Sequence, residues 1–181
     1  MKYILAALLI TLLLSTNFAG QSPAVDEPGC ATEQSKSLNF LVGTWKVRSN
    51  FRVSRSENKW ETTEAVSRIS HLFENCIYQE ILTGKRDDRP HQFTGLFSYN
   101  NLSNKLQWAG GHSEHGVLTL YEGNFVDDEL VLESQLFLRS NLVYFRIVFT
   151  KTETGFNVRS ERSRDKKLWD AGWYRSYTRK E

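Results

Sequence analysis

The chain has 181 residues, which is enough for one domain with a substantial buried core. It carries 23 Lys and Arg against 21 Asp and Glu, a formal net charge of +2 at pH 7. This balance gives no electrostatic footprint for nucleic acid or for a charged membrane surface, and we expect no nucleic-acid partner.

The N-terminus, "MKYILAALLITLLLSTNFAG", is typical of a secretory signal peptide. Lys2 supplies the positive start, and the apolar stretch Ile4–Leu14 is shorter than the ~20 residues that a membrane-spanning helix needs. We predict a signal peptide over residues 1–19 and no membrane span after its removal. An uncleaved anchor is the alternative. Without these residues, which hold only one charged side chain, 22 basic and 21 acidic side chains remain.

Residues 20–37 are polar and have no hydrophobic period, which predicts a flexible leader arm. The chain has two cysteines, Cys30 in this arm and Cys76 further on. In an oxidising compartment an even pair favours a disulfide. Two buried free thiols are the other interpretation.

A short helical turn is expected around residues 33–41, where Ser35 or Ser37 is suited to cap it. Beyond it, runs with strand periodicity follow one another at short spacing. The predicted strands cover residues 41–53, 59–73, 76–84, 91–100, 105–111, 116–126, 129–137, 142–151, 155–165 and 171–180. Short polar segments such as Asp127-Asp128 separate them and predict tight turns.

Alternation assigns inner and outer faces to these strands. On four strands the residues that share one face are Trp45, Val47, Phe51 and Val53; Cys76, Tyr78, Glu80 and Leu82; Phe93, Phe97 and Tyr99; and Val143, Phe145, Ile147 and Phe149.

Hairpin-length connections favour antiparallel, up-and-down order, and closure removes the long edges that about ten open strands would expose. We therefore predict one all-β domain over residues 38–181, an antiparallel barrel of about ten strands preceded by a short helical turn. A two-sheet sandwich is the alternative.

Several motifs resemble the calycin superfamily, which includes lipocalins, fatty-acid-binding proteins and nitrobindins. These are the Gly-x-Trp of "FLVGTWKV", "SRISHLFENCIYQEILTG" with Cys76 and Glu80, the hairpin "LQWAGGHSEHGVLTLYEG", and "KLWDAGWYRSYTRK" with Trp169, Gly172, Tyr174 and Arg175. From Leu38 to the C-terminus the chain is similar to lipocalin-like domains of unknown function in secreted bacterial proteins. The resemblance implies a lipocalin-like barrel and implies no activity.

Two of the four histidines, His112 and His115, lie in a glycine-rich turn. A zinc site needs three or four ligands on a rigid frame, and on a strand this spacing sends the two rings to opposite faces. A solvent-exposed turn is expected here, with no metal, no haem and no other cofactor.

The candidate ligand-binding residues are the inner-face aromatic and charged side chains Trp45, Glu80, Phe97, Trp108, Phe145 and Arg175. An inward carboxylate paired with an arginine can hold a polar ligand head, as an arginine holds a carboxylate in small barrels. The alternatives are that it forms a structural ion pair or lies on a wet outer face. The aromatic side chains either line a cavity or fill the core.

Three functions remain open at this level. The first is a secreted or periplasmic barrel that binds a small apolar or amphipathic molecule in its interior. The second is an isomerase or lyase in which Tyr78, Glu80 and Arg175 act as acid and base. The third is a domain without a ligand that works through surface contacts. Asn101 begins an Asn-Leu-Ser glycosylation acceptor, which acts only in a eukaryotic source.

Overall fold

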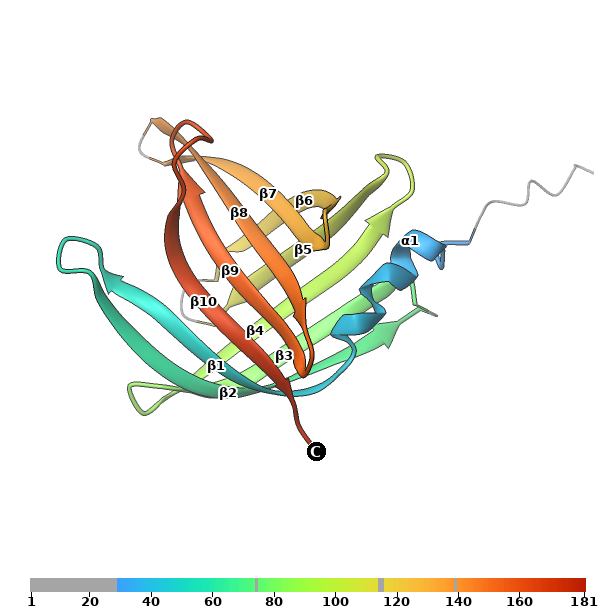
Figure 1. Ribbon diagram of the computed structural model, residues 1–181, viewed down its shortest axis with the longest axis horizontal. Coiled ribbons are helices and arrows are strands. Elements are labelled where there is room, and N and C mark those ends of the chain that lie inside the picture. Colours follow the sequence, from blue (N-terminus) through green and yellow to red (C-terminus); the bar gives the residue numbers. More distant parts are fainter. Residues whose placement is uncertain (1–28, 74, 114–115, 139) are drawn as a thin grey trace, which may run out of the picture.

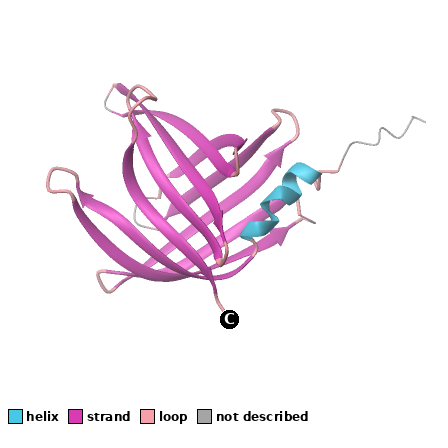
Figure 2. Cartoon of the chain, in the orientation of Figure 1, coloured by secondary structure: helices cyan, strands magenta, loops and turns pink. Residues whose placement is uncertain are grey.

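The computed structural model describes residues 29–181 except 74, 114, 115 and 139. Ten antiparallel strands form a closed barrel in which each strand pairs with its neighbours in the chain, and the last strand pairs with the first (Figure 1). The strands form a single layer wrapped around one core, and the helical segment lies across one end (Figure 2). The predicted all-β up-and-down barrel is therefore confirmed, and the sandwich alternative is excluded.

The elements have the following bounds: α1 Glu33–Lys36, the 3₁₀ helix η1 Ser37–Leu41, β1 Gly43–Ser54, β2 Lys59–Leu72, β3 Ile77–Arg86, β4 Arg89–Asn100, β5 Lys105–His112, β6 Leu118–Val126, β7 Glu129–Leu138, β8 Asn141–Thr152, β9 Gly155–Ser163 and β10 Asp170–Arg179. The expected helical turn before the first strand is thus present. Residues 1–28, which hold the predicted signal peptide and the start of the leader arm, lie outside the described part of the chain.

Alternation of side chains produces the inner face of the barrel as expected. On β3, Tyr78, Glu80 and Leu82 are buried while their neighbours are more exposed. The prediction is wrong for Val53 on β1. The register between β1 and β2 shifts between Arg52 and Ser54, so Val53 lies in a bulge and is exposed.

The helical segment closes one end of the barrel, which we call the helix end. Leu38 and Leu41 of η1 are buried in the core. The indole Nε1 of Trp45 donates a hydrogen bond to the carbonyl oxygen of Leu41 at 2.8 Å. The hydroxyl of Tyr78 donates to the carbonyl of Ser35 at 2.9 Å and also contacts the side-chain oxygen of Asn39. These buried polar contacts fix the segment across the strand ends.

A disulfide joins Cys30 to Cys76, with 5.1 Å between the two Cα atoms. The bond connects the residues before α1 to the turn before β3, a sequence separation of 46 residues. Of the two interpretations left open by the sequence, the disulfide is confirmed and the pair of free thiols is excluded.

Aromatic rings fill the half of the interior next to the helix end. Their ring-to-ring contacts include Phe156 with Tyr177 at 4.2 Å, Trp45 with Phe156 at 5.1 Å, Trp108 with Tyr121 at 5.3 Å and Phe97 with Phe149 at 5.6 Å. The absence of a side chain at Gly110 leaves room for the indole ring of Trp108, because a Cβ atom on Gly110 would lie only 2.6 Å from that ring. Side chains therefore pack this region at close range.

Candidate functional site

Polar and charged side chains gather inside the barrel beside this aromatic core. Glu80 on β3 and Tyr177 and Arg175 on β10 are all buried, as is Ser67 on β2. In the sheet, β1 and β2 separate β3 from β10. The side chains of β3 and β10 therefore meet across the interior rather than along neighbouring strands. We call Ser67, Glu80, Arg175 and Tyr177 the interior cluster.

Two hydroxyl groups hold the carboxylate of Glu80, which is only 3% exposed. Ser67 Oγ donates to Glu80 Oε1 at 2.7 Å, and the hydroxyl of Tyr177 donates to the same oxygen at 2.9 Å. Burial raises the pKa of Glu80, while the positive charge of Arg175 and the two hydroxyl donors act in the opposite direction. The carboxyl group therefore holds a proton at a higher pH than an exposed glutamate.

Tyr177 remains a protonated donor in this environment. Burial, and then the neighbouring Glu80 carboxylate, raise the pKa of the Tyr177 hydroxyl. Its ring stacks on Phe156, so the side chain connects the aromatic core to the interior cluster.

Arg175 is the member of the cluster with unused hydrogen-bonding capacity. Its side chain lies over three aromatic rings, with the guanidinium carbon 4.6 Å from the Trp173 ring centre, 5.2 Å from Phe93 and 5.9 Å from Phe51. The residue is 3% exposed, yet its Nε and Nη2 atoms have no hydrogen-bond partner among the described residues. Buried donors are normally satisfied, and a guanidinium edge matches a carboxylate or another anion in a two-point contact.

The six residues predicted from the sequence to bind a ligand lie in three different places in the structure. It brings Glu80 and Arg175 into one cluster, since Arg175 acts electrostatically on the Glu80 carboxyl. It places Trp45, Phe97 and Trp108 in the packed aromatic core. Phe145 is half-buried against that core, on the part of β8 nearest the β7–β8 turn.

Sequence reasoning missed Ser67 and Tyr177, the two donors to Glu80. A signal for Tyr177 was present, because the period of two on the last strand puts it on the same face as Arg175. Ser67 shares the inner face of β2 with Ile69, but a serine on a strand carries little information by itself. Tyr78, nominated as a possible acid or base, uses its hydroxyl to hold the helical segment.

Several other charged side chains on the strands form ion pairs away from the interior cluster. Arg146 contacts Glu161, and Arg159 contacts Glu129 through both carboxylate oxygens at 2.8 Å. Arg162 lies near Asp170 beside the β9–β10 loop. The side chains of these pairs are partly solvated.

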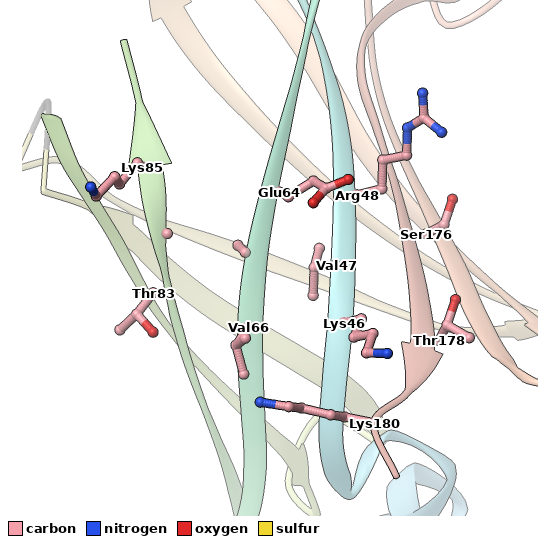
Figure 3. A pocket seen from close by; sticks show the side chains of 12 residues that line it. Lys46, Val47, Arg48, Glu64, Val66, Thr83, Lys85, Ser176, Thr178 and Lys180 are labelled. Atoms are coloured by element: carbon pink, nitrogen blue, oxygen red, sulfur yellow. The ribbon is translucent and has the colours of Figure 1, made fainter. Parts of the chain in front are cut away.

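A groove of about 810 Å³ crosses the outer face of β10, β1, β2 and β3 (Figure 3). Its charged side chains are Lys46, Arg48, Glu64, Lys85 and Lys180, and Arg48 lies opposite Glu64 in the strand register. The side chains of these five residues are exposed, so water solvates them and competes with a bound anion. The groove lacks the buried, unsatisfied donor that distinguishes Arg175.

No group of three His, Cys, Asp or Glu side chains suited to a metal ion occurs within the described residues. His115 and the side chain of His112 lie outside that part of the chain, so the prediction of a solvent-exposed histidine turn stays a prediction.

None of the helices in the described residues is long and apolar enough to cross a membrane. No protein-family model matches the chain, and no curated protein matches it.

Proposed function

We propose that this chain is a secreted or periplasmic lipocalin-like barrel that binds a small amphipathic molecule in its interior, with an anionic group of the ligand against Arg175. One observation carries the proposal, namely the buried guanidinium of Arg175, whose Nε and Nη2 atoms find no partner among the described residues. A bound carboxylate satisfies both atoms at once and removes the cost of leaving buried donors unpaired.

The surroundings of Arg175 suit a ligand that is apolar beyond its charged group. The rings of Phe51, Phe93 and Trp173 face the guanidinium. Ligand sites are mostly apolar and aromatic with a few placed polar groups, which is the composition found here. The ligand therefore combines one anionic group with an alkyl or aromatic body.

The ligand enters from the end opposite the helix, which we call the free end. The turns β1–β2, β3–β4, β5–β6, β7–β8 and β9–β10 lie there. Towards the free end, Phe51, Phe145 and Trp173 are only half-buried, whereas the helix end is filled by buried rings. The half-buried rings are the side chains that move aside for the body of the ligand.

The Glu80 carboxyl tolerates an anionic ligand nearby because its pKa is raised by burial. An additional negative charge beside Arg175 raises that pKa further, so binding is accompanied by proton uptake at Glu80. The predicted signal peptide and the disulfide support export to an oxidising compartment.

Isothermal titration with dodecanoate and with dodecanol tests the proposal. We expect dodecanoate to bind with a dissociation constant of about 1 μM, roughly −8 kcal/mol, and dodecanol to bind more weakly. Arg175→Lys keeps the positive charge but removes the two-point donor edge, and it should lose the preference for dodecanoate. Arg48→Lys, on the outer face, is the matched control and should bind as the wild type does.

Equal binding of dodecanoate and dodecanol, or an unchanged preference in Arg175→Lys, contradicts the role of Arg175. Absence of binding of both molecules by folded wild-type protein rejects interior binding of this ligand class. Circular dichroism of each variant separates loss of binding from loss of fold.

A further inference from the structure

Two neighbouring loops at the free end display large apolar side chains to solvent. The β7–β8 turn and the β9–β10 loop lie side by side (Figure 1) and line a common pocket of about 880 Å³. Phe137 is 76% exposed and Leu168 is 80% exposed, and Leu138, which follows Phe137 on β7, is also exposed. We call Phe137, Leu138 and Leu168, with the nearby Arg164 and Lys167, the loop patch.

Hydrogen bonds within the β9–β10 loop hold Leu168 in its exposed position. Asp165 Oδ1 accepts hydrogen bonds from the backbone N–H of Lys167 at 2.9 Å and of Leu168 at 3.1 Å. Ser163 Oγ accepts from the backbone N–H of Lys166 at 2.9 Å. Exposing a leucine on a well-bonded loop has no benefit for folding, because its apolar surface stays in water.

The charges around these apolar side chains are unequal. Arg164 and Lys167 have no ion-pair partner among the described residues. Asp170 pairs with Arg52 and Arg55, and Asp165 remains a negatively charged carboxylate that accepts hydrogen bonds from backbone N–H groups, so the loop sets two unpaired cations against one carboxylate without an arginine or lysine partner in the described part of the chain. The net charge of the whole chain gave no sign of this local excess, because the positions of the charges come from the fold.

We propose that the loop patch docks the protein on an anionic lipid surface. Phe137, Leu138 and Leu168 enter the boundary between headgroups and acyl chains, and Arg164 and Lys167 contact anionic headgroups. The apolar side chains complement the acyl chains of such a surface, and the flanking cations complement its negative charge. A symmetric contact between two copies of the patch would place the cations of one copy against those of the other, which disfavours self-association.

Docking by this patch points the free end of the barrel at the membrane. The proposal does not depend on what the interior binds, because no interior ligand takes part in the test. The docking proposal can therefore be confirmed or rejected independently of the proposed interior binding site.

Cosedimentation with vesicles tests the proposal. The two vesicle types are pure phosphatidylcholine and a mixture of phosphatidylcholine with phosphatidylglycerol in a 3:1 ratio (about one anionic lipid in four, enough for a negative surface potential). We expect the wild type to bind the anionic vesicles more tightly, and added salt to weaken that binding. Every variant is prepared with the same N-terminus, so the apolar stretch at the start of the chain cancels in the comparison.

Phe137→Gln and Leu168→Gln should each weaken binding to the anionic vesicles by about tenfold, the value expected for losing one buried large apolar side chain. Arg164→Gln with Lys167→Gln should weaken it by about fivefold per charge removed and should abolish the preference for anionic lipid.

Two controls match these changes elsewhere on the surface. Leu102→Gln removes a leucine that is 96% exposed on the β4–β5 turn at the helix end. Lys46→Gln with Lys180→Gln removes two cations from the outer groove. Both controls should bind vesicles as the wild type does.

The proposal is overturned if the wild type does not bind the anionic vesicles, or if the controls lose as much binding as the patch variants. It is also overturned if sedimentation velocity without lipid shows a dimer that Phe137→Gln converts to a monomer, since a second copy then covers the patch.

Discussion

Glu80 and Glu129 are both strand carboxylates influenced by an arginine, one inside the barrel and one outside. Glu80 is buried and receives hydrogen bonds from Ser67 and Tyr177. Glu129 is about one-third exposed and receives hydrogen bonds from Arg159 and Thr150. The same residue type on a strand thus has two opposite electrostatic environments, one buried inside the barrel and one paired with an arginine outside it.

The pKa shifts of the two groups have opposite signs for this reason. Desolvation dominates at Glu80 and raises its pKa. Hydrogen bonds from Arg159 and Thr150 dominate at Glu129 and lower its pKa to about 2. Burial penalises the charged carboxylate, whereas a solvated pair with an arginine favours it. Variants of the two sites therefore separate the effect of burial from the effect of pairing.

The largest difference in unfolding free energy between the two sites is expected when their arginines are removed. Arg175→Met leaves the Glu80 carboxyl in the interior without its compensating charge and should lower the free energy of unfolding by about 3–5 kcal/mol at neutral pH. Arg159→Met on the outer face should cost less than about 1 kcal/mol, because water solvates the remaining Glu129. Urea unfolding of both variants measures the difference. Similar costs at the two sites would mean that water reaches the interior cluster.

Removing one tyrosine hydroxyl from each face of β10 compares the stability that a buried and an exposed hydroxyl contribute. Tyr177→Phe deletes a hydrogen bond to the buried Glu80 and should destabilise the protein by about 1–3 kcal/mol. Tyr174→Phe, on the outer face of the same strand, keeps its ring against Trp60 and should change stability by less than about 0.5 kcal/mol. Thermal unfolding ranks the two variants, and a larger effect in Tyr174→Phe would contradict the assigned faces.

The pH dependence of stability tests the raised pKa of Glu80. A group with a raised folded-state pKa stabilises the protein fully below its unfolded pKa, and this contribution is lost as the pH rises through the folded value. Relative to Glu80→Gln, the wild type should lose about 1.4 kcal/mol per pH unit within that window, starting near pH 4.5. Denaturant unfolding from pH 4.5 to 8 measures the slope. A difference that stays constant with pH contradicts burial as the dominant cause.

Glu129 should show the smallest effect, with the opposite sign. Its lowered pKa contributes stability that is present above the unfolded pKa, near 4.5, and is lost as the pH falls towards about 2. Because the pair with Arg159 is partly exposed, we expect the wild type to lose less than about 1 kcal/mol relative to Glu129→Gln over this range. Denaturant unfolding of the wild type and Glu129→Gln between pH 5 and pH 2 measures this loss of stability. A loss as large as that of the interior site would contradict the solvated position.

The sequence by itself determined the class of fold and the faces of most strands. Alternation with a period of two predicted that Tyr78, Glu80 and Leu82 share one face of the third strand, and in the structure that shared face is the inside of β3. Short polar turns between consecutive strands predicted up-and-down order. These features are local, because hairpin pairing and side-chain direction follow from neighbours a few residues apart.

Only the tertiary structure decided which side chains meet inside the barrel. Glu80 and Tyr177 are 97 residues apart, and they meet because the sheet closes on itself and brings β3 and β10 to face each other across the core. The pairing of Cys30 with Cys76 and the bulge that exposes Val53 likewise depend on contacts between separate segments of the chain. Strand periodicity assigns each side chain a face, but it contains no information about which distant strand that face will meet.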